Sequence, residues 1–142
     1  MRLIIRQFEI KDQQAVIRLW DDCGLTVSWN DPAKDIKRKL TEQPELFLVA
    51  LEDETDSIIG SIMAGFDGHR GAVNYLAVHP KQRQTGIAKK LMIQIEKLLT
   101  AAGCPKINLM IRNTNLEATA FYQAIGYEPQ DVMVYGKRLI ED

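Results

Sequence analysis

The stretch Arg83-Gln84-Thr85-Gly86-Ile87-Ala88 decides the fold, because it joins an apolar run that ends at Val78 to a long amphipathic pattern that begins near Ile87. A strand that ends in a tight loop and leads directly into a helix leaves the first backbone N–H groups of that helix without acceptors. Those donors, together with the positive end of the helix dipole, bind anions. Gly86 and Ala88 are small, so no bulky side chain keeps a phosphate away from the backbone. The stretch therefore predicts a site for a phosphate-bearing ligand.

The residues around this loop are basic, although the chain as a whole carries a net charge of −1. Between residues 81 and 97 the only acid is Glu96, and the bases are Lys81, Arg83, Lys89, Lys90 and Lys97. Neither the Walker phosphate loop nor the dinucleotide fingerprint occurs in the chain, so the ligand is not predicted to be held by either of these.

Two motifs resemble the signatures of the GNAT acyltransferases. The pattern Arg-x-x-Gly-x-Ala, from Arg83 to Ala88, is similar to motif A of that family, which holds the pyrophosphate of coenzyme A. Residues 115–127 are similar to the second signature, Asn-x-x-Ala-x-x-Phe-Tyr-x-x-x-Gly-Phe/Tyr. The two motifs occur in the family's order and at an ordinary separation, and the resemblance covers nearly the whole chain. It implies one acyltransferase domain over residues 1–142.

The hydrophobic pattern predicts an α/β (α+β) fold in the order βααββββαβαβ, which also resembles a GNAT domain. The resemblance implies a mixed, mostly antiparallel central sheet of six to seven strands flanked by about four helices. Strands are expected at residues 3–8, 46–51, 58–66, 73–78, 107–111 and 132–139. Helices are expected after an Asp12 cap, after the Asp31-Pro32 cap and first-turn proline, from Ile87 to a stop at Gly103, and from Leu116 to a stop at Gly126.

The resemblance assigns a cofactor site to two segments. The backbone N–H groups of the loop would hold the pyrophosphate of acetyl-CoA, with the hydroxyl of Thr85 as a further possible donor. The backbone of Leu76, Ala77 and Val78 would pair with the pantetheine arm and polarise the thioester carbonyl. The side chains of these three residues alone would indicate only a buried core.

The second signature supplies the expected catalytic residue. Tyr122 resembles the family's general acid, which protonates the departing thiolate, and its alternative role is that of a packed aromatic beside Phe121. Asn115 resembles an asparagine that contacts the cofactor near the sulfur, and it also suits a helix N-cap. Neither cysteine lies in a motif, so neither is expected to be catalytic, and no His/Cys cluster has the spacing of a metal site.

The general base is left open by the sequence. Many relatives carry a carboxylate on the fourth or fifth strand, whereas residues 71–75 contain no acid. The ribosomal-protein N-terminal acetylases, which the chain also resembles, have a glutamate where Met110 stands, and this argues against a protein N-terminus as acceptor. The remaining candidates are a water molecule ordered by Asn74 or Tyr75, or the imidazole of His69.

Composition bounds the other possibilities. A hydrophobic content of 46% and a charged content of 26% are ordinary for a soluble domain, and the net charge argues against general nucleic-acid binding. No apolar run is long enough to span a membrane. Two cysteines and a basic, polar N-terminus favour reduced thiols and a cytoplasmic location, with a homodimer as a possible assembly.

The best interpretation is an acyltransferase that moves acetyl from acetyl-CoA to a primary amine by direct attack, with Tyr122 as acid and no metal. The amine would belong to a small molecule or to a lysine or peptide. Residues 21–56 hold ten acids against Lys34, Lys37, Arg38 and Lys39, which would favour a cationic acceptor unless the acids merely form a hairpin turn. The rival interpretation is a non-catalytic module that senses coenzyme A.

Overall fold

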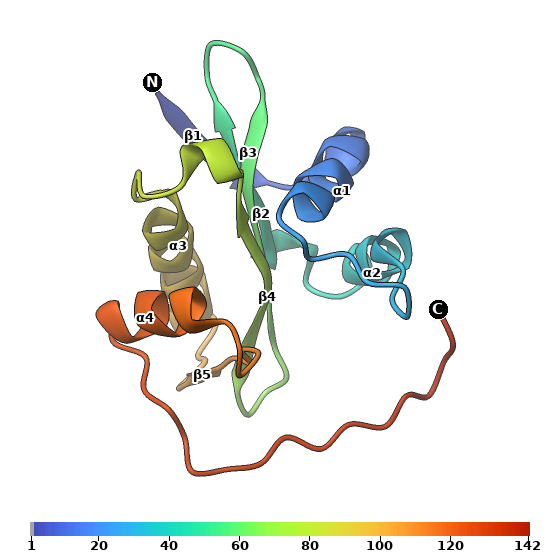
Figure 1. Ribbon diagram of the computed structural model, residues 1–142, viewed down its shortest axis with the longest axis vertical. Coiled ribbons are helices and arrows are strands. Elements are labelled where there is room, and N and C mark those ends of the chain that lie inside the picture. The colour runs from blue at the N-terminus through green and yellow to red at the C-terminus, as the bar shows by residue number, and fades with distance from the viewer. Residues whose placement is uncertain (1) are drawn as a thin grey trace.

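The computed structural model describes residues 2–142, which form a five-stranded sheet with helices on both faces (Figure 1). Strands lie in the sheet in sequence order: β1 (Leu3–Gln7), β2 (Phe47–Glu52), β3 (Ile58–Phe66), β4 (Gly71–Val78) and β5 (Ile107–Asn108). The helices are α1 (Gln13–Asp22), α2 (Pro32–Lys39), α3 (Ile87–Ala101) and α4 (Leu116–Ala124), with short 3-10 turns at Ile10–Asp12, Pro44–Leu46 and Pro80–Gln82. The first four strands pair antiparallel, and β5 pairs parallel to β4. The predicted α/β class is confirmed.

The two faces of the sheet bury different side chains of the same strands. In β2, Phe47, Val49 and Leu51 pack toward α1 and α2, whereas Leu48 and Ala50 pack toward α3. Because both faces are covered, β2 is apolar at nearly every position instead of alternating between apolar and polar residues.

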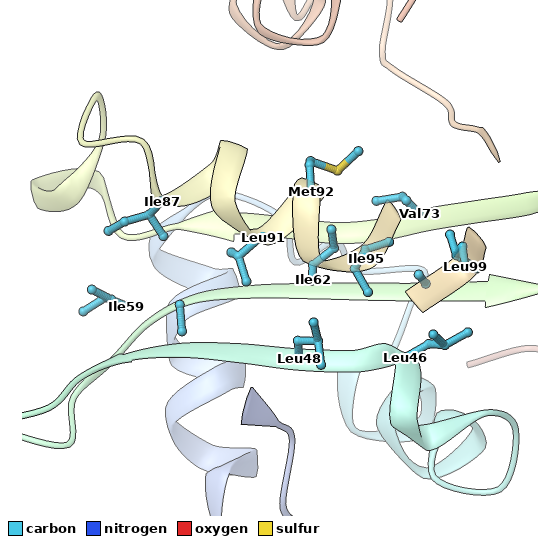
Figure 2. Packing of buried hydrophobic residues seen from close by; sticks show 12 residues of the cluster. Leu46, Leu48, Ile59, Ile62, Val73, Ile87, Leu91, Met92, Ile95 and Leu99 are labelled. Atoms are coloured by element: carbon cyan, nitrogen blue, oxygen red, sulfur yellow. The ribbon is translucent and has the colours of Figure 1, made fainter. Parts of the chain in front are cut away.

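Helix α3 lies against the sheet along its whole length. Figure 2 shows Ile87, Leu91 and Ile95 of this helix facing Ile62 of β3 and Leu48 of β2, and all five side chains are buried. Each fully buried aliphatic side chain of this kind contributes about 1.5–3 kcal/mol relative to an exposed one. This packing holds the N-terminus of α3 in place beside the end of β4.

The helix starts differ in how they are capped. Asp31 caps α2 as predicted, since its Oδ1 accepts from the N–H of Ala33 at 2.9 Å, with Pro32 in the first turn. The predicted Asp12 cap of α1 is wrong. The Asp12 carboxylate makes no cap hydrogen bond to α1; instead it accepts from the Glu9 N–H at 2.9 Å and from both terminal nitrogens of Arg6. The ion pair with Arg6 thus fixes the turn before α1 to β1.

A β-bulge interrupts β4 in the middle of the sheet. Ser61 pairs with Ala77 and Met63 with Asn74, so two residues of β4 lie opposite one residue of β3. Tyr75 occupies the bulge with φ of +52°, which is unusual for a bulky aromatic residue. Both Asn74 and Tyr75 therefore point toward the α1 and α2 face of the sheet.

Ser61 and Trp20 hold this bulge. The buried hydroxyl of Ser61 donates to the carbonyl of Tyr75 at 2.8 Å and accepts from the indole N–H of Trp20 at 2.8 Å. The rings of Trp20 and Tyr75 stack with centroids 3.8 Å apart and planes 12° apart. A strained backbone conformation persists only when its surroundings determine it in this way.

The far edge of the sheet is shorter than predicted. Within residues 2–142, β5 pairs only Ile107 and Asn108, opposite Gly71 and Ala72, so the predicted strand over 107–111 is wrong beyond its first two residues. Residues 132–139 form no strand either. Figure 1 shows this part of the chain running unpaired from α4 around the sheet to the side of α2. Its β-branched and aromatic residues suit an extended backbone, but no neighbouring strand edge supplies the hydrogen bonds.

Replacing Ser61 by alanine should lower the free energy of unfolding by about 1–3 kcal/mol, because the buried indole N–H of Trp20 and the carbonyl of Tyr75 both lose their partner. Urea unfolding measures the change. Ser57→Ala is the matched control, since the exposed hydroxyl of Ser57 accepts only from Thr55, and it should change stability by less than about 0.5 kcal/mol. Equal stability of the two variants would contradict the assigned role of Ser61.

Candidate functional site

The loop between β4 and α3 presents a row of free backbone donors. Gln84 and Gly86 have φ of +64° and +84°, and Gly86 is the residue immediately before α3. Among residues 2–142, no group accepts a hydrogen bond from the backbone N–H of any residue from Arg83 to Lys89. Consecutive unpaired N–H groups at a helix N-terminus bind phosphate. The loop therefore has the free N–H groups that the prediction of an anion site requires.

The side chains of the loop leave the space around these donors open. A β-carbon placed on Gly86 would meet no atom within 4 Å. The Nε of Arg83 donates to the carbonyl of Val78 at 3.3 Å, which ties the loop to the end of β4. The hydroxyl of Thr85 donates to the carbonyl of Gln82 at 2.5 Å, so the suggestion that it donates to a ligand is not supported and only its backbone N–H is free.

The basic residues of the loop are exposed at the surface of the structure. Its exposed cations are Lys81, Arg83, Lys89 and Lys90. Within residues 2–142 none of the four forms an ion pair with an acidic side chain. Uncompensated cations beside free N–H donors raise the local concentration of a polyanionic ligand.

The strand that leads to this loop has a free edge. Only Gly71 and Ala72 pair with β5, so within the described residues the segment from Val73 to Val78 has no strand neighbour on that side. Leu76 and Val78 turn their side chains to the α3 face, while Ala77 turns to the α1 and α2 face. The backbone of the three predicted residues lies on this free edge of β4, where an extended ligand can pair with it.

The two predicted residues of α4 lie on the same side of the sheet. Asn115 caps α4, since its Oδ1 accepts from the N–H of Ala118 at 3.0 Å. The ring of Tyr122 packs edgewise against Phe121 and Tyr127, and it contacts the core cluster that Leu76 and Val78 also contact. Tyr122 therefore lies on the α3 side of the sheet, the same side as the side chains of Leu76 and Val78.

The hydroxyl of Tyr122 has no hydrogen-bond partner among residues 2–142. Burial raises the pKa of Tyr122 to about 12. A phenol with this pKa keeps its proton at every pH up to about 11 and can donate it. It is a weaker acid than an exposed tyrosine, so its proton would be transferred only to a group that has already developed negative charge.

Two groups of candidates from the sequence do not meet at this site. His69 lies in the exposed turn at the end of β4 that is opposite the loop, about 15–20 Å along the strand from the bulge. The acids of residues 52–56 form the turn between β2 and β3 (Figure 1), as the alternative interpretation proposed.

One contact near β4 could not be found from the sequence. Tyr75 donates its hydroxyl to Asp35 of α2 at 2.6 Å, and Asn30 of the loop between α1 and α2 donates to the same carboxylate at 2.6 Å. Asp35 and Tyr75 are 40 residues apart in sequence, and no motif links them. The sequence held one indirect indication, because residues 71–75 contain no acid and any carboxylate at this strand must therefore come from another element.

Further features limit the kinds of site. Among residues 2–142, no three His, Cys, Asp or Glu side chains lie close enough to hold a metal ion, and no helix is long and apolar enough to cross a bilayer. The thiols of Cys23 and Cys104 each donate to a backbone carbonyl. The arrangement as a whole offers a loop of free N–H donors, a free strand edge that leads away from it, and a protonated phenol.

Comparison with known proteins agrees with this geometry. The model of the acetyltransferase (GNAT) family matches residues 13–127. An acetyltransferase of Sodalis glossinidius is 52% identical over 139 residues, which cover 97% of this chain and 96% of that protein. An uncharacterized N-acetyltransferase of Yersinia pestis is 49% identical over 138 residues, with the same shares covered.

A solved structure of the NatC complex, bound to a Gag peptide and coenzyme A, has the same fold with a TM-score of 0.79 and 26% identity. The match covers 92% of this chain and 87% of that one. The family match and the two close relatives span most of the chain, so acetyl-CoA-dependent acetyl transfer is the activity of its class. The chain belongs to the GNAT family of acetyltransferases.

Proposed function

We propose that the protein is an N-acetyltransferase that moves the acetyl group of acetyl-CoA to a primary amine. The observation that carries the proposal is the row of free N–H donors from Arg83 to Lys89 beside the unpaired edge of β4. Together they match a ligand with a pyrophosphate at one end and an extended amide-containing arm. The coenzyme supplies the activated acetyl group, and the residues of the chain bind and orient it.

Each part of the ligand has a proposed contact. The backbone N–H groups of Arg83, Gln84, Gly86, Ile87 and Ala88, with that of Thr85, would hold the pyrophosphate. The backbone of Leu76, Ala77 and Val78 would pair with the pantetheine arm, and one N–H there would stabilise the oxyanion as the amine attacks. Asn115, at the start of α4, would contact the arm near the sulfur.

Tyr122 is proposed as the general acid. Its proton is retained at neutral pH because burial raises the pKa of the phenol to about 12. A thiolate that leaves from the thioester carries the negative charge that such a donor requires. Direct transfer needs the amine, the polarised carbonyl and this donor in one place, and it needs no nucleophile from the protein.

The proposal is tested by a panel of primary amines, with acetyl-CoA as donor and free thiol as the readout. Release of coenzyme A that depends on an amine supports the proposal. Binding of acetyl-CoA without release for any small amine, lysine or peptide in the panel would favour the rival interpretation, a module that senses coenzyme A.

Gly86→Val should remove the stabilisation by acetyl-CoA, because the branched side chain fills the open space beside the free N–H groups. For the native protein, ligand at about 100 times its dissociation constant should add about 2.7 kcal/mol to the free energy of unfolding. Thermal unfolding with and without ligand measures this.

Gly68→Val is the matched control for this experiment. Gly68 also has a positive φ, +91°, and open space around it, but it lies in the turn between β3 and β4. Both variants should lose about 1–3 kcal/mol from backbone strain, and only Gly68→Val should still respond to acetyl-CoA. An equal response of both variants would show that the loop does not bind the ligand.

Tyr122→Phe should leave the affinity for acetyl-CoA unchanged and lower kcat by about 10- to 1,000-fold, since only the hydroxyl is removed and the ring packing stays. Tyr135→Phe serves as control, because Tyr135 is 86% exposed and should have no effect. Unchanged kinetics of Tyr122→Phe would make Tyr122 a packing residue.

The pH dependence of kcat/KM should show a rising limb set by the amine of the acceptor and no falling limb below about pH 11. The amine must lose its proton before attack, and the Tyr122 phenol stays protonated because its pKa is about 12. A loss of activity between about pH 8 and 10 would contradict the assignment of this phenol as the acid.

A further inference from the structure

The strand that borders the proposed site offers no carboxylate of its own to take a proton from the acceptor amine. Ala72 and Asn74 are the exposed residues of β4, and neither side chain is a base. Tyr75 is the next residue on that face, and its hydroxyl donates to Asp35 at 2.6 Å. Asp35 is therefore connected to the middle of β4, although it lies on α2.

The hydrogen bonds around Tyr75 and Asp35 run in one direction, from Asn30 to the Tyr75 hydroxyl and from that hydroxyl to Asp35. Asn30 donates from Nδ2 to the Tyr75 hydroxyl at 3.0 Å and to Asp35 at 2.6 Å. The phenol oxygen therefore has Asn30 as a donor and Asp35 as an acceptor. A proton that arrives at this oxygen can be matched by one that leaves along the 2.6 Å contact to the carboxylate. The Asp35 side chain is 22% exposed, so solvent can remove the proton afterwards.

The position of Tyr75 is fixed more tightly than packing alone requires. Its ring stacks on Trp20, its carbonyl is held by Ser61, and its φ is +52°. Strain of this kind at a bulky residue is a reason to look for function, because the surrounding structure maintains it at a cost of about 1–3 kcal/mol. The bulge places the Tyr75 side chain on the α1 and α2 face of β4, and among residues 2–142 this strand has a free edge beyond Ala72.

We propose that Tyr75 and Asp35 form the relay that takes the proton from the acceptor amine, with Tyr75 in contact with the amine and Asp35 acting through Tyr75. This inference rests on the proposed acetyl transfer. As the bond between nitrogen and the acetyl carbon forms, the nitrogen gives its proton to the Tyr75 oxygen, and the Tyr75 proton passes to Asp35. The carbon–sulfur bond breaks, and Tyr122 supplies the proton that the sulfur takes up. Solvent then removes the proton from Asp35 and restores that of Tyr122.

The charges around the pair are consistent with this role. Burial and the hydrogen bond to Asp35 raise the pKa of Tyr75, so the phenol is neutral at working pH and passes a proton instead of holding a charge. Arg38 of α2 donates to the other oxygen of Asp35 at 3.2 Å and pairs with Asp142 of the C-terminal segment at 2.6 Å. Arg38 and Lys34 both lower the pKa of the Asp142 carboxyl. The hydrogen bond from Arg38 thus holds the Asp35 side chain in position beside Tyr75.

The test compares Asp35→Asn, Tyr75→Phe and Asp35→Ala with the native protein, using acetyl-CoA and an amine found in the panel. Asparagine can still accept the Tyr75 hydrogen bond but cannot take up a proton, so the contact survives and the relay does not. We expect kcat to fall by about 10- to 100-fold in Asp35→Asn and in Tyr75→Phe, with KM for acetyl-CoA and the melting temperature nearly unchanged. Formate added to Asp35→Ala should restore part of the lost kcat.

Asp21→Asn is the control, because Asp21 also accepts from a hydroxyl, that of Thr26 at 2.8 Å, but lies on the exposed side of α1. It should behave as the native protein does. Asp35→Asn with a kcat within threefold of native would overturn the relay, as would a loss in Asp35→Ala that formate does not restore. If Asp35→Asn does not fold, an unchanged kcat in Tyr75→Phe overturns it equally. A native protein that turns over no amine refutes the proposed function and the relay together, whereas active variants beside an active native protein refute the relay alone.

Discussion

The bulge at Tyr75 in β4 is the constraint on which the rest of the site depends. β4 pairs with β5 only at Gly71 and Ala72, and among residues 2–142 the segment from Val73 through the bulge to Val78 has no strand neighbour on that side. This free edge is where an extended arm could pair with the backbone. The same bulge turns Tyr75 toward α2, which joins the free edge of β4 to Asp35. Trp20 of α1 and Ser61 of β3 hold this geometry from the same face of the sheet, because Trp20 stacks on Tyr75 and Ser61 hydrogen-bonds to both residues.

The sequence predicted best those elements that depend on local chemistry. The start of α2 followed from Asp31 and Pro32, and the amphipathic period of α3 predicted the face that Leu91 and Ile95 bury. Predictions from the sequence were wrong where contacts between distant segments determine the structure. The strand expected at residues 132–139 has suitable residues but no partner edge, and Asp12 was drawn away from its helix by Arg6. Such competition between a local cap and a tertiary ion pair is not visible in a pattern of residue types.

The site shows the same contrast between features set by local sequence and features set by packing of distant segments. Both motifs were readable because their residues are close in sequence, and the free N–H groups after Arg83 and the cap at Asn115 are where the pattern predicted them. The hydroxyl of Thr85 turned inward to Gln82, which a motif cannot indicate. The pair of Asp35 and Tyr75 depends on how α2 docks on the sheet. The sequence indicated only that an acid was missing from β4, and the fold supplies one from a helix.

The central claim is that the loop after β4 and the free edge of β4 bind one continuous ligand. Hydrogen exchange of backbone amides, with and without coenzyme A, tests it directly, because the amides from Gln84 to Lys89 have no acceptor among residues 2–142. The account predicts slower exchange in that loop and in residues 73–78 together when coenzyme A is added, with no comparable change in the turn at residues 67–70. Unchanged exchange rates in the loop, or slower exchange only in α1 and α2, would contradict the account.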